Sequence, residues 1–277
     1  MCRWLVYKGP SIFMDTLLIK PQHSLIDQSM RAMMNYVPGV GNVTTNGDGF
    51  GLGWYGERPF PGLFRSIRPA WNDDNLRHLA AQIRSPLFFA HVRAAAPGTE
   101  VQRTNSHPFL YGQWLFQHNG SVGDFQRMRR DLQCAVAPEL FPHIRGTTDS
   151  ETLFYLALTY GLETNPLDAL RQLIKKVEEV RQAHDVTTPA HLTLATTDGH
   201  TVYALRYSSH NQSKTLFYSR NLQAIRELDG DYEAMPPGSQ ILVSEPLDEL
   251  SDNWAPVPEA SFVIMRDGKV RCVPVNE

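Results

Sequence analysis

The order of strands and helices constrains the fold more than any other feature of this 277-residue sequence. Short apolar or glycine-rich runs typical of strands fill the first half, two helices with clear start signals follow, and the last third returns to strands. A parallel sheet needs a helix between successive strands, and this alternation is missing here. The sequence therefore predicts an α+β fold. It has no repeat or obvious linker, so we expect a single domain over residues 1–277.

Strands of the first half are predicted from runs of bulky residues. They are expected at residues 2–7, ending at Gly9-Pro10, and at residues 87–92 and 114–118. In residues 48–54, glycine alternates with bulky residues, which predicts a strand with one bare face that another backbone or a ligand can approach closely. The strand lacks the Lys-Ser/Thr signature of a phosphate-binding loop. Residues 35–48 are predicted to form a loop.

The two helices and the later strands carry specific boundary signals. Thr148 to Glu151 match a capping box before an apolar run, and Asn165-Pro166 supply an N-cap and a first-turn proline for the second helix. Strands are expected on either side of Asp198-Gly199 and of Asp267-Gly268, which are typical hairpin turns. The C-terminal third is therefore predicted to be mostly antiparallel.

Composition and charge exclude several classes of protein. The formal net charge is -3 and no run of Lys and Arg occurs, so we expect no nucleic acid or anionic membrane as partner. The densest basic cluster, Arg127, Arg129 and Arg130, is interpreted as a solvated helix face. No apolar stretch approaches the roughly 18 residues of a membrane span, and no secretory signal is evident, so we expect a cytoplasmic protein.

Cysteine and histidine usage argues against a disulfide framework or a metal centre. The three cysteines, Cys2, Cys134 and Cys272, are far apart. The ten histidines show no ligand spacing with a Cys or a carboxylate. We therefore expect no metal and no cofactor.

Cys2 is a candidate nucleophile because of its position. Removal of Met1 would leave a residue that carries both a thiol and an α-amine. An α-amine has a pKa of about 7.7 to 8.0, so a fraction is unprotonated at neutral pH and can take the thiol proton. On position alone, the simpler interpretation is a small buried residue at the start of a strand.

Other residues offer the further parts that acyl transfer from an amino-acid headgroup needs. Asn119 and Gly120 follow an apolar strand and could together donate to an oxyanion, although Asn-Gly is also a common turn. Arg93, at the end of another strand, could hold a carboxylate. Asp149 could hold an ammonium group, or could serve only the electrostatics of a helix start.

Six motifs together, in this order, resemble the class II glutamine amidotransferases. They are Met1-Cys-Arg3, Asp48-Gly-Phe-Gly-Leu-Gly-Trp-Tyr55, Ala90-His-Val-Arg93, Asn105-Ser-His-Pro-Phe109, His118-Asn-Gly120 and Gly146-Thr-Thr-Asp-Ser-Glu151. Two further segments, Pro21-Gln-His-Ser-Leu25 and Ser244-Glu-Pro-Leu247 with Trp254, are similar to the stand-alone members. Those members include the γ-glutamyl amidase of the ergothioneine pathway and the amidotransferase-like subunit of the fungal glutathione-degradation complex.

The resemblance implies a four-layer αββα sandwich of the Ntn-hydrolase type, with two antiparallel sheets between helical layers. It implies that Cys2 is the nucleophile and that Asn119 and Gly120 form the oxyanion hole. Arg93 and Asp149 would hold the α-carboxylate and α-ammonium of a glutamyl group, and His107 would line its pocket. Sugar-aminating relatives carry Trp and Thr after this arginine, whereas this chain has Ala94 to Pro97, so the loop over glutamine is expected to differ.

Three functions follow as hypotheses. The first is hydrolysis of a γ-glutamyl amide, either glutamine or a γ-glutamyl peptide or conjugate, through a Cys2 thioester with release of glutamate. The second is a glutaminase subunit that supplies ammonia to a separate synthase, and a partner peptidase is the other expected kind of subunit. The third is a non-catalytic binding or regulatory protein with the same fold.

Overall fold

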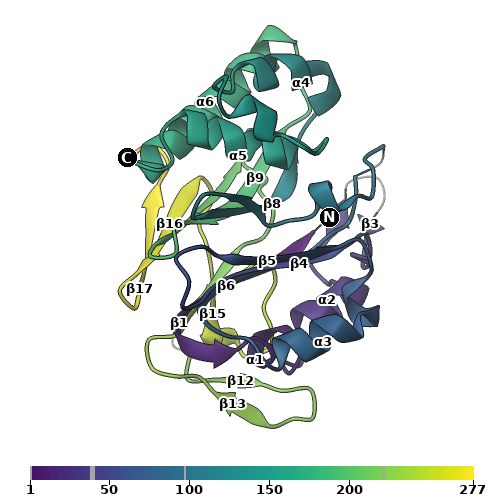
Figure 1. Ribbon diagram of the computed structural model, residues 1–277, viewed down its shortest axis with the longest axis vertical. Coiled ribbons are helices and arrows are strands. Elements are labelled where there is room, and N and C mark those ends of the chain that lie inside the picture. The colour runs from purple at the N-terminus through teal and green to yellow at the C-terminus, as the bar shows by residue number, and fades with distance from the viewer. Residues whose placement is uncertain (1, 38–40, 97, 221) are drawn as a thin grey trace.

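Two antiparallel sheets form the middle of the molecule (Figure 1), a computed structural model that describes the chain except residues 1, 38–40, 97 and 221. The first sheet has the strand order β15 (Trp254–Pro256), β11 (Phe217–Ser219), β14 (Gln240–Val243), β1 (Arg3–Phe13), β6 (Arg84–Val92), β4 (Phe50–Tyr55) and β5 (Gly62–Ser66). The second has the order β17 (Lys269–Pro274), β16 (Ser261–Arg266), β10 (Val202–Ser208), β9 (Ala190–Thr197), β8 (Trp114–Val122) and β7 (Phe109–Tyr111). Two small pairs lie outside them, β2 (Tyr36–Val37) with β3 (Gly41–Asn42) and β12 (Ala224–Arg226) with β13 (Tyr232–Ala234).

Helices cover the outer face of each sheet (Figure 1). Against the first sheet lie α1 (Asp15–Leu18), α2 (Leu25–Arg31) and α3 (Asp74–Ala80), and against the second lie α4 (Phe125–Cys134), α5 (Asp149–Thr159) and α6 (Pro166–Ala183). Short 3-10 turns occupy Ala70–Asn72, Arg103–Asn105, Phe141–His143 and Ser251–Asn253. Within the described residues, no helix is both long and apolar enough to cross a membrane. The predicted α+β class with two antiparallel sheets is confirmed.

Three hydrophobic cores correspond to the three interfaces between the four layers. One joins α4 to α6 with the second sheet, one joins α1 to α3 with the first sheet, and one lies between the sheets. Strand β1 contributes to two of them because successive side chains point to opposite faces. Trp4 and Val6 face the space between the sheets, while Leu5 and Tyr7 face the helices. This alternation also sets the direction of the residues that precede Trp4.

The predicted helix N-caps and hairpins are confirmed by side-chain contacts and backbone angles. The capping box at α5 is not closed, however, because the Glu151 carboxylate accepts from the Arg145 and Gly146 N–H groups. The Thr148 hydroxyl accepts from the Glu151 N–H at 3.2 Å, and the Asn165 side chain accepts from the Asp168 N–H at 3.4 Å. The hairpin of β16 and β17 turns at Asp267 and Gly268, which have φ angles of 50° and 70°. The basic cluster at residues 127–130 lies on α4, as expected of a helix face.

The bare face predicted for the glycine-rich strand is used by another backbone. A Cβ on Gly51 of β4 would overlap the carbonyl oxygen of His107, and one on Gly53 would lie 2.8 Å from side-chain carbons of Pro108 and Leu115. The glycines therefore allow the chain between the sheets, including His107, to approach β4 closely.

Some boundaries predicted from the sequence are wrong. Strand β1 does not end at Gly9-Pro10 but continues to Phe13 across a register shift between Lys8 and Ile12. Pro10 is tolerated because residues within this shift pair with neither neighbouring strand, so its missing N–H breaks no ladder bond. Helices α1 to α3 were not predicted, and α4 was expected only as the helix that carries the basic cluster. The predicted loop at residues 35–48 holds β2 and β3, and its residues 38–40 lie outside the described residues.

Candidate active site

Cys2 lies at the start of β1, beside the end of β6. The first ladder pair, Arg3 with Val92, brings Cys2 next to Arg93 and Ala94. Its thiol is half-buried and donates to the carbonyl oxygen of Ala94 at 3.7 Å. By the alternation of β1, its side chain has the same direction as Trp4, toward the second sheet.

Arg93 is a buried cation held by backbone oxygens. Its Nη1 and Nη2 donate to the carbonyl oxygens of Asp48 at 3.5 Å and Glu100 at 3.1 Å. No carboxylate of the described residues forms an ion pair with it. Burial lowers the pKa of Arg93, while the nearby Cys2 and Asp48 act in the opposite direction. An arginine in this setting can bind the carboxylate of a ligand in a bidentate manner.

Asn119 and Gly120 lie on β8, in the sheet that faces Cys2. Leu115 of β8 belongs to the core between the sheets, and the Gln117 side chain donates to the Leu5 carbonyl of β1 at 3.3 Å. Asn119 is two positions after Gln117, so its side chain lies on the same face of β8 and its amide points toward the first sheet. Asn119 is 0% exposed, and neither its Nδ2 nor its Oδ1 has a hydrogen-bond partner among the described residues.

Glycine is the residue that fits sterically at position 120, and its backbone N–H is also suited to the candidate site. A Cβ at this position would overlap the carbonyl oxygen of His191 on β9 and would lie 2.5 Å from Nε2 of His118. Its identity is thus explained by strand packing alone, and Asn119 is the more informative member of the pair. The Asn-Gly dipeptide lies within β8 and forms no turn.

Three buried histidines connect the sheets next to these residues. His107 stacks on His91 with ring centroids 4.2 Å apart, and His91 Nε2 lies 3.2 Å from the His118 carbonyl. Burial lowers the pKa of His91 to about 3, and burial with neighbouring cationic groups lowers the pKa of His107 well below its usual range. Burial therefore favours the neutral form of both rings. The ring nitrogens of His107 have no partner in the described part of the chain and can contact a ligand.

Asp149 is the first residue of α5 and ties this helix to the end of β8. Its Oδ2 accepts from the Val122 N–H at 2.7 Å, and its Oδ1 accepts from the Ser150 N–H at 2.7 Å. No hydrogen bond or ion pair among the described residues joins Asp149 to Cys2 or Arg93. A carboxylate has about four acceptor sites, so Asp149 keeps capacity for an ammonium group. The helix-start interpretation holds in part, and a ligand role is compatible with it.

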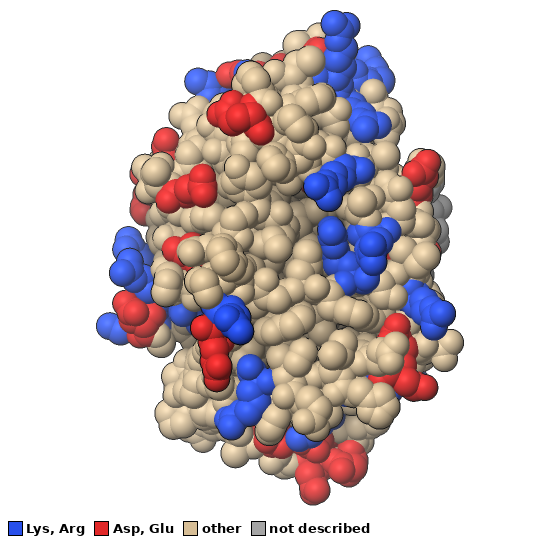
Figure 2. Space-filling view, in the orientation of Figure 1, with Lys and Arg blue, Asp and Glu red and all other residues tan. Residues whose placement is uncertain are grey.

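A cavity of about 380 Å³ adjoins the beginning of α5 and includes Arg65, Arg145 and Glu151 in its lining. Burial is the main cause that lowers the pKa of Arg65, and the nearby charges of Arg103 and Arg145 lower it further. Figure 2 shows basic side chains gathered near the middle of one face, whereas acidic and basic groups alternate around its edge. None of the candidate site residues Cys2, Arg93, His107, Asn119, Gly120 and Asp149 is part of the lining of this cavity.

The arrangement combines a thiol, a buried amide donor and a buried guanidinium at one end of the space between the sheets. It suits nucleophilic attack on an amide that carries a carboxylate. Sequence reasoning missed His91, whose signal was a polar residue within an apolar strand, and Asp48, which orients the residues after β6 by accepting from the Ala95 N–H at 2.8 Å. It also assigned no role to Arg3 or Glu245.

Comparison with known proteins identifies relatives that align with nearly the whole chain. The profile of the class II glutamine amidotransferases matches residues 22–277. The probable glutamine amidotransferase DUG3 of Saccharomyces cerevisiae is 32% identical over 99% of this chain and 84% of its own length. The γ-glutamyl-hercynylcysteine sulfoxide hydrolase of Mycolicibacterium smegmatis is 27% identical over 99% of this chain and 100% of its own.

Solved structures show the same fold. A glutamine aminotransferase class-II domain protein from Silicibacter pomeroyi aligns with a TM-score of 0.71 and 31% identity, covering 99% of each chain. The glutamine phosphoribosylpyrophosphate amidotransferase of Bacillus subtilis aligns with a TM-score of 0.59 and 12% identity, covering 99% of this chain and 49% of its own. The second likeness concerns the fold alone and matches the sandwich of Ntn-hydrolase amidotransferases that the resemblance implied.

Proposed function

The chain belongs to the class II glutamine amidotransferase family, and on this premise we propose that it hydrolyses a γ-glutamyl amide through a thioester on Cys2, with release of glutamate. The observation that carries the proposal is Asn119. Its amide is fully buried and has no partner in the described part of the chain, which costs folding free energy, and its direction toward the sheet of Cys2 suits an oxyanion donor.

In the proposed reaction, removal of Met1 frees the α-amine of Cys2, which takes the thiol proton. The sulfur attacks the γ-carbonyl carbon, and the resulting oxyanion accepts hydrogen bonds from Asn119 Nδ2 and the Gly120 N–H. Collapse breaks the C–N bond, and the leaving amine takes the proton from the α-ammonium. Water then cleaves the thioester, giving glutamate and restoring the thiol.

The substrate would be held by groups on three different elements. Arg93 after β6 would bind the α-carboxylate, because its charge has backbone oxygens but no carboxylate partner within the described residues. Asp149 at the start of α5 would bind the α-ammonium. His107, neutral and with free ring nitrogens, would line the glutamyl pocket.

The relatives do not agree on the leaving group of the substrate. The hydrolase relative is named for a γ-glutamyl conjugate, and the yeast relative for glutamine amidotransfer. We propose that this chain releases either ammonia or the amine of a γ-glutamyl peptide or conjugate. A glutaminase role beside a partner synthase is the second candidate, and the similarity to amidotransferases favours it over a non-catalytic role.

The test measures glutamate released from glutamine, glutathione and a γ-glutamyl thiol conjugate by protein whose N-terminus is shown to be Cys by intact mass. Release is expected from at least one substrate and should be lost in Cys2→Ala. The control is Cys134→Ala, because Cys134 is an exposed cysteine on α4. Equal release by the Cys2→Ala variant would refute the proposal. Release only after addition of a synthase partner would favour the second candidate.

A further inference from the structure

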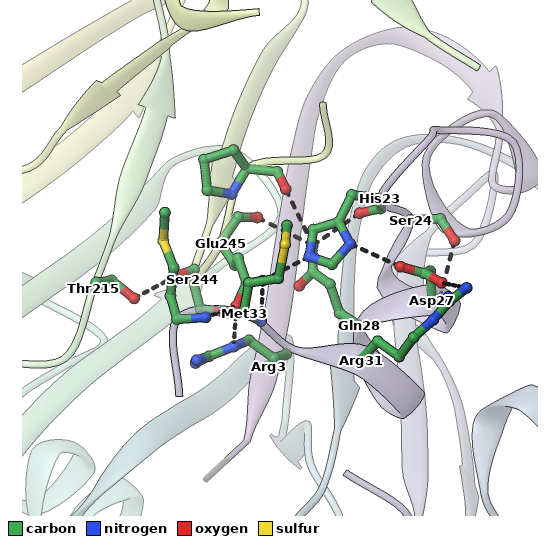
Figure 3. Close-up of polar contacts among 12 residues, drawn as sticks. Arg3, His23, Ser24, Asp27, Gln28, Arg31, Met33, Thr215, Ser244 and Glu245 are labelled. Carbon is green, nitrogen blue, oxygen red and sulfur yellow. Dashed lines mark hydrogen bonds and ion pairs between the residues drawn. The ribbon is translucent and has the colours of Figure 1, made fainter. Parts of the chain in front are cut away.

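Three of the sequence motifs meet in one buried cluster through residues that have no role in the proposed mechanism (Figure 3). They contribute Arg3, His23 and Glu245, from the start of β1, the residues before α2 and the segment after β14. His23 and Glu245 are 222 positions apart in the chain. We call Arg3, His23 and Glu245 the Glu245 cluster.

Glu245 is the centre of this cluster. Its Oε2 lies 2.8 Å from Arg3 Nε and accepts from the Met34 N–H at 3.0 Å. Its Oε1 lies 2.6 Å from His23 Nε2 and accepts from the Met33 N–H at 2.7 Å. The side chains of Arg3 and Glu245 are each 1% exposed. One carboxylate thus binds three separate segments of the chain.

The contacts within the cluster favour its ionised form. His23 contacts Glu245 through Nε2 and Asp27 Oδ2 through Nδ1 at 2.8 Å, so both ring nitrogens must carry protons if both carboxylates are charged. Burial acts to lower the pKa of His23, but the hydrogen bonds and charges of Glu245 and Asp27 together raise it. Burial acts to raise the pKa of Glu245, yet His23, Arg3 and two backbone N–H groups together lower it.

Stability alone does not explain such a group. Taking two ions out of water costs several kcal/mol each, and an apolar pair of similar volume is often at least as stable. A buried ion pair does, however, fix direction and distance better than apolar packing. A geometric role is therefore worth seeking among the atoms that the pair contacts.

Arg3 connects Glu245 directly to the candidate nucleophile. Its side chain lies on the helix face of β1, and its Nη1 donates to the Cys2 carbonyl oxygen at 3.1 Å. Cys2 directly precedes the strand, so this hydrogen bond acts on its backbone where the ladder of β1 begins. The neighbouring Ser244 adds to this support, since its N–H donates to the Trp4 carbonyl at 3.0 Å and its Oγ accepts from the Trp4 N–H at 2.9 Å.

We propose that Glu245, acting through Arg3, is a positioning residue that fixes the orientation of Cys2 for attack. The inference rests on the proposed function for its kinetic effect, but the position of Cys2 can also be measured independently of turnover. Arg3 offers a fork of donors, which lets it contact Glu245 and the Cys2 carbonyl together.

The test is a double-mutant cycle with Arg3→Met, Glu245→Gln and the double variant, assayed for glutamate release. Each single change is expected to lower kcat by about 10- to 100-fold, because small displacements of a nucleophile cost this much. KM should stay nearly unchanged, since Arg93 and Asp149 lie on other elements. The double variant should be no slower than the slower single variant. Additive losses would refute action through Arg3.

A second readout separates this inference from the proposed function. Iodoacetamide labelling of Cys2, measured by peptide mass spectrometry relative to the exposed Cys134, should change severalfold in both single variants. This ratio can be read even if the wild-type protein releases no glutamate. An unchanged ratio together with unchanged kcat would overturn the inference.

The matched control is Glu178→Gln on α6. Glu178 pairs with the buried Arg181 and accepts from the Tyr207 and Ser209 hydroxyls, at a place remote from Cys2. It should lower thermal stability without changing kcat or the labelling ratio. If Glu245→Gln does not fold, Arg3→Lys serves instead, because lysine keeps the charge but lacks the fork. Wild-type kcat and labelling in that variant would count against the proposal.

Discussion

Two buried asparagines differ in what their amides contact. Asn105 and Asn119 are both 0% exposed. The Asn105 amide donates to the Glu100 carbonyl at 3.0 Å and accepts from the Thr147 N–H at 2.8 Å, whereas that of Asn119 has no partner among the described residues. Asn105 is thus explained by structure, whereas the amide of Asn119 is free for the oxyanion role that we propose.

This contrast gives a prediction for single residues. Asn119→Leu should lower kcat by about a hundred- to thousand-fold, the usual cost of losing an oxyanion donor, without lowering Tm, because two unpartnered polar atoms leave the core. Asn105→Leu should lower the free energy of unfolding by about 1 to 3 kcal/mol because it removes satisfied hydrogen bonds. Kinetics and thermal unfolding of both variants check this. Near wild-type kcat in Asn119→Leu would exclude the oxyanion role.

Helices α5 and α6 begin with equivalent caps but differ in what their first turns carry. Thr148 caps α5 and Asn165 caps α6 through side-chain acceptors. The first residue of α5 is Asp149, which also contacts the end of β8. The first turn of α6 contains no candidate site residue. The start of α5 is thus the element whose local stability bears on the site.

Removing each cap should separate stability from function. Thr148→Ala and Asn165→Ala are each expected to cost about 1 kcal/mol of unfolding free energy, typical of a lost N-cap. Only Thr148→Ala should also lower kcat/KM severalfold, because Asp149 would lose its fixed direction. Urea unfolding and steady-state kinetics provide the comparison. An equal loss of kcat/KM in both variants would show a general effect of stability.

At the scale of the whole molecule, the Glu245 cluster joins the first strand of the first sheet to a segment late in the chain. Arg3 opens β1, while Glu245 follows β14, its neighbour in the sheet. His23 connects the cluster to the helical layer, because its Nδ1 contacts the carboxylate of Asp27 on α2. The cluster therefore makes the stability of the fold depend on pH.

The raised pKa of His23 sets the sign of this dependence. A group with a raised folded-state pKa contributes stability below its ordinary value of 6.5 and loses it as the pH rises through the folded value. Glu245, with a lowered pKa, contributes above its ordinary value of 4.5 and loses its contribution as the pH falls. The difference in unfolding free energy between wild type and His23→Gln should thus be larger at about pH 5.5 than at about pH 9. A difference that stays constant over this range in urea titrations would contradict the assignment.

Much of the fold could be predicted because its signals are local. Caps such as Thr148 and turns such as Asp267-Gly268 depend on contacts within a few residues, and both were confirmed. The short helices α1 and α2 carried too few periodic residues for such a prediction. The site roles of Cys2 and Asn119, like the single domain, remain predictions that experiments must test.

The sequence by itself determined the α+β order, the starts of α5 and α6 and the family motifs, since each depends on neighbouring residues. Only the tertiary structure decided that the Asn119 amide has no partner among the residues that the structure describes and that Arg3, His23 and Glu245 share one buried site. The physical reason is that strand pairing and sheet packing bring together residues that are hundreds of positions apart. No local pattern of hydrophobicity or hydrogen bonding encodes which of them will meet.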